Sequence, residues 1–106
     1  MRLYRLVHGA DAPFGDFLSD EAKGREKRRE QLTDERLYRG ISMFSSAITA
    51  RRIQRQVPQL GRWLAILDLP EVGYIEIHKT RGPDHYTVIG LPLILRQHVV
   101  AIERLR

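Results

Sequence analysis

Residues 61–89 read GRWLAILDLPEVGYIEIHKTRGPDHYTVI and hold three strand-like segments divided by two turns. The segments span residues 61–69, 73–78 and 85–89. Leu-Pro-Glu separates the first two and Arg-Gly-Pro-Asp separates the last two, and residues of these types favour reversals of the chain. Three short strands in succession predict antiparallel pairing, and we expect the Trp63 side chain in the core.

Further strand-like segments flank this region. Residues 3–8 and 37–44 precede it, and residues 97–105 follow it. After residue 44, Ser45 or Ser46 can cap a helix that continues to about residue 56, before Pro58. The apolar residues of this helix recur at helical spacing, at Ala47, Ala50, Ile53 and Val57. Six strands without repeated βα alternation predict an α+β domain with a small, mainly antiparallel sheet and one or two helices.

Residues 10–36 lack a sustained hydrophobic period. Three apolar side chains, Phe14, Phe17 and Leu18, precede a charge-dense stretch at residues 21–30. A loop of this length in a small domain is usually functional or disordered. We expect the aromatic part to pack against the domain, where it could serve as a lid, with a short exposed helix near residues 19–31 as an alternative.

The composition is that of one globular domain: 106 residues, 42% hydrophobic and 29% charged. No apolar run approaches the roughly 18 residues that a membrane span needs, and no signal-peptide pattern is present. The chain has no Cys, which excludes disulfides, thiolate chemistry and Cys-based metal sites. We therefore expect a single-domain cytoplasmic protein with no membrane partner.

The net charge of +5 makes a polyanionic partner worth considering. Acidic and basic residues balance between positions 20 and 36, so the surplus lies elsewhere, above all at Arg51, Arg52 and Arg55 on the expected helix. These arginines could meet the phosphates of a nucleic acid. A solvated helix face is the alternative interpretation.

The hairpin around Arg81 and Gly82 carries ionisable side chains. With a symmetric loop, His78 would lie opposite His85 and Glu76 opposite Thr87, and all four would share one face of the sheet. Two imidazoles beside a carboxylate can exchange protons near neutral pH, or bind a divalent metal when a further ligand is present. The alternative is the polar outer face of an antiparallel sheet.

Three segments together resemble the ADP-ribosyltransferase superfamily. Leu6-Val7-His8-Gly9 resembles the first-strand signature of the poly-ADP-ribose polymerase branch, and Tyr4-Arg5 resembles the first-strand arginine of the bacterial-toxin branch. Gly40-Ile41-Ser42-Met43-Phe44 with the following Ser45-Ser46-Ala47 is similar to the middle strand and its helix. Asp84-His85-Tyr86-Thr87-Val88 lies where the polymerase branch has its Glu-Tyr-x-Val strand. The ending from His85 to Leu93 is similar to small uncharacterised bacterial members of the superfamily.

This resemblance implies a split sheet and a site for NAD, used as a substrate. It implies that Arg5 or His8 holds a ribose or phosphate of NAD, that the Gly9 backbone bonds the nicotinamide amide, and that Ser42 shapes the pocket. His85 stands where the family has its catalytic Glu, and Glu76 is the substitute carboxylate expected beside it. Since Arg5 and His8 point to opposite faces of a regular strand, we expect one of them to line the cleft.

Three functions follow as hypotheses. The first is an ADP-ribosyltransferase-like domain that binds NAD or a related nucleotide, with NAD glycohydrolysis or transfer to an RNA or protein acceptor as its reaction, and with Glu76, His78 and His85 as catalytic candidates. The second is a non-catalytic RNA- or protein-binding module that uses Arg51, Arg52, Arg55, Arg62 and Arg81. The third is an RNA phosphotransfer or phosphodiester enzyme built on His78 and His85, because His78-Lys79-Thr80 and His85-Tyr86-Thr87 resemble the His-x-Thr motifs of 2H phosphoesterases.

Overall fold

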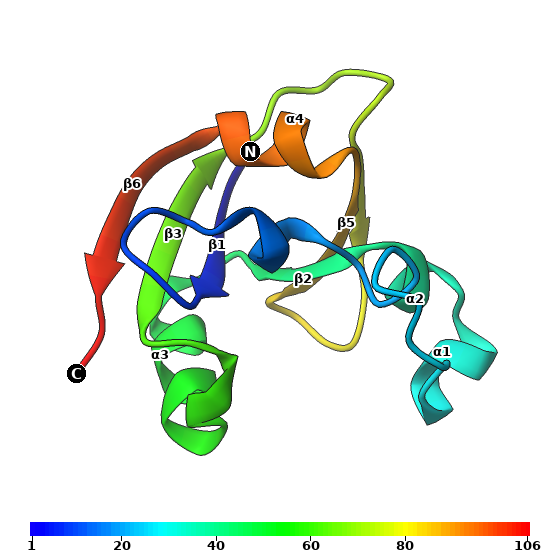
Figure 1. Cartoon of the computed structure of the whole chain (residues 1–106), viewed down its shortest axis with the longest axis horizontal. Coiled ribbons are helices and arrows are strands. Elements are labelled where there is room, and N and C mark those ends of the chain that lie inside the picture. Colours follow the sequence, from blue (N-terminus) through cyan, green and yellow to red (C-terminus); the bar gives the residue numbers. More distant parts are fainter.

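The fold is an α+β domain with a single antiparallel sheet, seen in a computed structural model that describes residues 1–106 (Figure 1). The six strands are β1 (Arg2–Val7), β2 (Ile41–Phe44), β3 (Trp63–Asp68), β4 (Glu76–Lys79), β5 (His85–Ile89) and β6 (Val99–Arg104). The α-helices are α1 (Arg29–Thr33), α2 (Arg36–Arg39), α3 (Ala47–Gln56) and α4 (Pro92–Gln97), and the 3₁₀ helices are η1 (Phe14–Phe17) and η2 (Pro58–Leu60). None of the helices is long and apolar enough to cross a membrane.

The strands follow the order β4-β5-β2-β1-β3-β6, and every neighbouring pair is antiparallel. The pairing of β1 with β3 extends over six residue pairs, from Arg2–Asp68 to Val7–Trp63. In contrast, β1 and β2 share the single pair Tyr4–Phe44. The sheet therefore consists of two three-stranded halves that meet along one narrow junction, which we term the seam.

Side chains pack on both faces of the sheet. On the first face, Leu3, Val7 and Met43 lie in a cluster with Phe17 of η1 and Leu95 of α4. On the second face, α3 covers a smaller cluster with these buried members: Leu6, Phe44, Ala50, Leu64 and Leu105. Alternation along the strands assigns residues to these faces, so Arg5 belongs to the first face and Ser42 to the second.

The expected helix and its ends are confirmed. Ser46 is the N-cap of α3, where its hydroxyl accepts a hydrogen bond from the Thr49 amide at 3.2 Å. After the helix, η2 leads to Gly61, which has φ of +124°. A Cβ on Gly61 would collide with the Val7 carbonyl, so only glycine lets β3 start this close to β1.

Two expected boundaries were wrong. Residues 37–44 were expected as one strand, but residues up to 39 form α2, because the Asp34 carboxylate accepts hydrogen bonds from the Arg36 backbone and side chain and favours a helical turn there. The last strand was expected from residue 97, but Pro92–Gln97 form α4, with Pro92 in its first turn, and β6 begins at Val99. The chain thus has four α-helices instead of one or two, three of them six residues or shorter.

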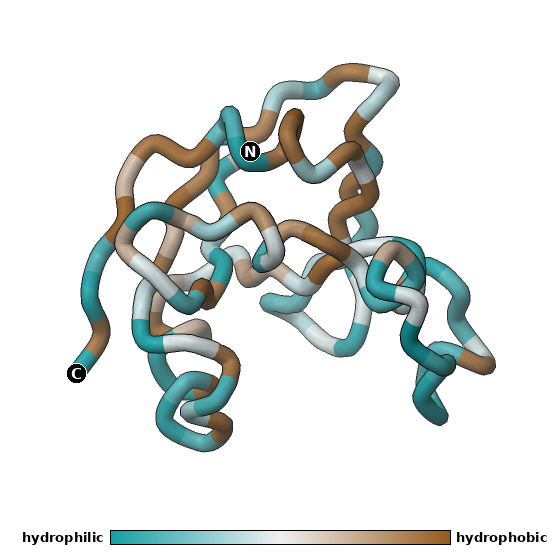
Figure 2. Tube along the Cα trace, viewed as in Figure 1, coloured by the Kyte–Doolittle hydropathy of each residue, from teal (hydrophilic) through white to brown (hydrophobic).

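The segment expected as a long loop packs down at its start. Phe17 is 1% exposed and lies in the first-face cluster, as expected, while Phe14 stays 45% exposed. The later, charged part carries α1, is mostly hydrophilic and lies at the end of the molecule away from β6 (Figure 2). Gln31 anchors this charged part, because its side chain is buried, at 1% exposed, and its amide donates to the Asp20 carboxylate at 2.8 Å.

The register expected for the β4–β5 hairpin was wrong by two residues. His78 lies opposite Thr87, and Glu76 lies opposite Ile89. The loop is centred on Gly82 and Pro83, because the Thr80 amide donates to the His85 carbonyl at 3.0 Å and closes the loop there. A shift of two residues preserves the face of each side chain, so the four polar residues still share the second face.

Candidate functional site

Arg5 spans the seam between the two halves of the sheet. Its Nη1 donates to the Ser42 carbonyl of β2 at 2.6 Å, and its Nε donates to the Asp16 carbonyl of η1 at 2.8 Å. Burial lowers the pKa of Arg5 to about 10, against the opposing effect of the Asp16 carboxylate. The guanidinium therefore stays charged at neutral pH, and it donates to a carbonyl on the β2 side of the seam.

His8 lies just beyond the end of β1 and is bound through both ring nitrogens. Nδ1 lies 2.5 Å from Asp16 Oδ1, and Nε2 lies 2.9 Å from the Gln59 carbonyl oxygen. A carboxylate and a carbonyl both accept hydrogen bonds, so both ring nitrogens carry a proton when both bonds form. The pKa of His8 is accordingly raised, first by the Asp16 hydrogen bond and then by the Gln59 carbonyl.

Asp16 is the functional side chain that sequence reasoning missed. It is 8% exposed, and its Oδ2 also accepts the His8 backbone amide at 2.7 Å. Because β1 ends at Val7, His8 escapes the alternation of the strand, and both Arg5 and His8 reach Asp16. The sequence feature that could have identified Asp16 is its place between two aromatic residues, Phe14 and Phe17, in a segment expected to pack against the domain.

On the second face, hydroxyl groups surround His85. Its Nε2 lies 3.0 Å from Ser42 Oγ, and its Nδ1 lies 2.8 Å from Thr80 Oγ1. Thr80 Oγ1 in turn lies 2.8 Å from Thr87 Oγ1. The four side chains form one chain of hydrogen bonds from buried Thr87 to half-buried Ser42.

The buried end sets the direction of this chain. Thr87 is 1% exposed and has Thr80 as its hydroxyl partner, so its proton is satisfied only when it donates to Thr80. Thr80 then donates to Nδ1, and Nε2–H of neutral His85 donates to Ser42. Burial, followed by the charge of Arg81, lowers the pKa of His85 and keeps the ring neutral. The Ser42 hydroxyl is left with a proton to offer a ligand.

Of the residues predicted for the NAD site, Arg5 and the catalytic candidate His85 therefore meet at Ser42, but from two sides. Arg5 holds the Ser42 carbonyl from the first face, and His85 holds its hydroxyl from the second face. Arg5 and His85 therefore lie on opposite faces of the sheet. Alternation along β2 likewise places Met43 on the first face and Ser42 on the second.

The remaining hairpin candidates lie in a separate contact. His78 Nε2 is 3.1 Å from Glu76 Oε1, in an exposed pair. Thr80, directly after β4, is bonded to His85, and Glu76 is not, so the substitute carboxylate has a different partner. No cluster of three or more potential metal-ligating side chains occurs. Gly9 lies outside these contacts, packed so tightly that a Cβ there would lie 2.7 Å from Asp11 Oδ1.

The three arginines of α3 have different surroundings. Arg51 forms an ion pair with Glu103 of β6 at 3.2 Å, and Arg52 is exposed. Arg55 lines a cavity near the end of the helix. Of the three arginines, Arg51 is therefore in an ion pair and Arg52 is not. Arg55 lines a cavity together with residues from other elements.

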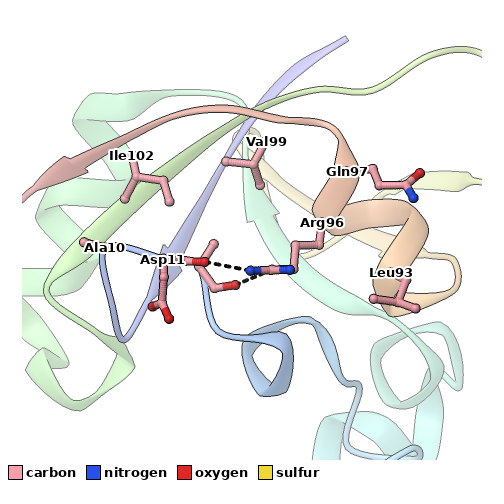
Figure 3. A pocket seen from close by; sticks show the side chains of 8 residues that line it. Ala10, Asp11, Leu93, Arg96, Gln97, Val99 and Ile102 are labelled. Carbon is pink, nitrogen blue, oxygen red and sulfur yellow. Dashed lines mark hydrogen bonds between the residues drawn. The ribbon is translucent and has the colours of Figure 1, made fainter.

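A cavity of about 340 Å³ lies between α4, β6 and the loop after β1. Arg96 crosses this space from α4 and donates to the backbone carbonyls of Asp11 at 3.0 Å and Ala12 at 2.7 Å (Figure 3). The rest of the lining is mainly apolar, with Leu93, Val99 and Ile102. These two hydrogen bonds of Arg96 therefore fix the loop after β1 against α4. None of the predicted NAD-binding residues lines this cavity.

Comparison with known proteins adds no constraint. No family model, curated protein or solved structure matches this chain. A proposal for the function therefore rests on the sequence resemblance and on the geometry of Asp16, Arg5, Ser42 and His85.

Proposed function

We propose that this chain is a small ADP-ribosyltransferase-like domain that binds NAD or a related nucleotide at the seam. The observation that carries the proposal is the convergence on Ser42, which is held by Arg5 from β1 and by His85 from β5. These three positions are the first-strand, middle-strand and late-strand positions that the sequence resemblance assigns to the nucleotide site. They are separated by 37 and 43 residues in the chain, so their contact is a property of the fold.

The division of the sheet supports the same proposal. A single residue pair joins β1 to β2, so backbone groups on both sides of the seam are free of a regular ladder. Such groups are available to side chains and ligands, as the contact from Arg5 to the Ser42 carbonyl illustrates. A nucleotide offers hydroxyl and phosphate oxygens that can accept a hydrogen bond from the Ser42 hydroxyl.

The charges around the seam favour binding over ADP-ribosyl transfer. Loss of nicotinamide leaves positive charge on the ribose, which a carboxylate stabilises and a neutral imidazole does not. His85 is held neutral, and the neighbouring Asp84 carboxylate already accepts bonds from Ser45 at 3.2 Å and Thr49 at 2.8 Å. Asp16 is engaged by His8. We therefore propose nucleotide binding as the main activity, with slow NAD glycohydrolysis as the turnover to be tested.

Calorimetric titration of the protein with NAD and with ADP-ribose tests this function. We expect saturable binding of at least one ligand, and roughly tenfold weaker binding to Ser42→Ala, because one polar contact to the ligand is lost. Thr33→Ala, which removes an exposed hydroxyl of α1, serves as the matched control and should bind as the wild type does. Absence of binding by both ligands at millimolar concentration would sink the proposal, and release of nicotinamide would show that turnover accompanies binding.

A further inference from the structure

A second cavity, of about 500 Å³, lies where the end of α3, η2 and the end of β6 come together (Figure 1). We term it the arginine cavity after its lining residues, which are Gln54, Arg55, Pro58, Arg62, Arg104, Leu105 and Arg106. Four of these seven residues are arginines, and they come from three separate parts of the chain. Its volume is in the range of small-molecule sites, roughly 300 to 1,000 Å³.

The four guanidinium groups have no acidic counterpart. No Asp or Glu side chain lines the cavity, and none of the four arginines forms an ion pair with one, whereas nearby Arg51 is paired with Glu103. The C-terminus of α3 opposes an anion with about half an elementary charge. Four full positive charges outweigh that fraction, so the cavity attracts anions.

Two further side chains shape the cavity for a polar ligand. Gln54 lines the cavity, and its amide forms no hydrogen bond within the protein but reaches solvent, because no buried side-chain nitrogen or oxygen lacks a partner. The amide is therefore free to donate to a ligand. Arg104 also lines the cavity, and its guanidinium carbon lies 5.5 Å from the ring centroid of Trp63, its pairing partner on β3.

We propose that the arginine cavity binds phosphate groups, either the linked phosphates of a small molecule or consecutive phosphates of single-stranded RNA. Arginine suits this chemistry because its planar fork donates two parallel hydrogen bonds to phosphate oxygens. The Gln54 amide supplies an uncharged donor. The site is independent of the seam, since none of Arg5, Ser42 and His85 lines it.

Trp63 provides the readout, because it is the only tryptophan of the chain and lies against Arg104. We expect inorganic pyrophosphate to change Trp63 fluorescence in a saturable way. The double variant Arg55→Ala/Arg62→Ala should bind about 100-fold more weakly, because two charge-assisted hydrogen bonds are lost. The control Arg29→Ala/Arg39→Ala removes the same charge from two exposed arginines without ion pairs and should bind as the wild type does.

The variant Gln54→Leu tests the site without changing its charge, and it should weaken binding about tenfold. Circular dichroism verifies the fold of each variant. Titration with a short single-stranded RNA distinguishes the sources of phosphate. RNA binding that falls with salt, with a slope reduced by about 1.4 in the double variant, supports a nucleic-acid ligand, and pyrophosphate binding alone supports a small one. Failure of both probes to bind, or equal loss of binding in the control variant, would overturn the proposal.

Discussion

Asp16 illustrates how one buried carboxylate organises the residues around it. It accepts the His8 amide and the His8 ring, and it lies close enough to Arg5 to favour the charged guanidinium. The two cations would repel each other without it, and the Arg5 charge indeed acts to lower the pKa of His8. The end of β1 is therefore tied to η1 by charge as well as by packing of Phe17.

The protonation of His8 makes part of the stability depend on pH. The pKa of His8 is raised above its ordinary 6.5 in the folded chain, so its contribution is fully present below 6.5 and is lost as the pH rises through the raised value. The ring is 59% exposed, so solvent limits the contribution to about 1 kcal/mol. We expect His8→Gln to be less stable than the wild type at mildly acidic pH and the two to converge in alkaline solution.

Thermal unfolding of both proteins across this pH range measures the difference. Asp16→Asn should reduce the same pH dependence, because the carboxylate that raises the pKa of His8 most is gone while the Gln59 carbonyl remains. A gap between wild type and His8→Gln that widens as the pH rises would contradict the assignment of His8 as a cation.

At the scale of elements, α3 begins and ends where local chemistry dictates. Ser46 supplies the capping hydroxyl, and Pro58 follows the last turn, in agreement with the expectation from spacing alone. Asp84 then ties the helix to the β4–β5 loop through Ser45 and Thr49. The helix is thereby fixed against the half of the sheet that carries His85.

Loss of the cap should weaken the helix measurably. Ser46→Ala leaves the Thr49 amide without its partner, and we expect the free energy of unfolding to fall by about 1 kcal/mol. Ser46→Asp restores a capping oxygen and a favourable charge at the helix N-terminus, so its stability should return close to that of the wild type. Chemical denaturation of the three proteins gives the comparison, and equal losses in both variants would argue against a capping role.

At the scale of the whole molecule, the seam is where two half-sheets depend on side chains for their connection. One residue pair joins β1 to β2, and the guanidinium of Arg5 provides a further link to the Ser42 carbonyl. Each half has its own extensive pairing, with six residue pairs between β1 and β3 and four between β2 and β5. Arg5 is therefore expected to matter for stability as well as for ligand binding.

Removal of the guanidinium should be costly. Arg5→Met leaves the Ser42 and Asp16 carbonyls without a donor, and we expect a loss of about 3 kcal/mol in the free energy of unfolding. Arg5→Lys keeps the charge but cannot place two donors in the same fork, so its loss should be smaller. Urea denaturation measures both variants. A change within about 0.5 kcal/mol for Arg5→Met, which is ordinary for an exposed position, would mean that the seam holds without Arg5.

Local patterns determined the fold class, the six strands and the principal helix. Alternation, turn residues, a capping serine and a proline act over a few residues, so they can be recognised without knowledge of distant contacts. The common face of Glu76, His78, His85 and Thr87 was predictable for the same reason, because an even shift in register preserves the face.

The tertiary structure alone decided which side chains became partners. The hairpin register depends on the contact between Thr80 and His85, α2 depends on Asp34, and the charge of His8 depends on a carboxylate eight residues away in η1 and a carbonyl 51 residues away in η2. The arginine cavity likewise combines Arg55 with Arg62 and Arg104. Such partnerships arise when packing brings separate elements together, and no local pattern in this sequence encodes the resulting distances.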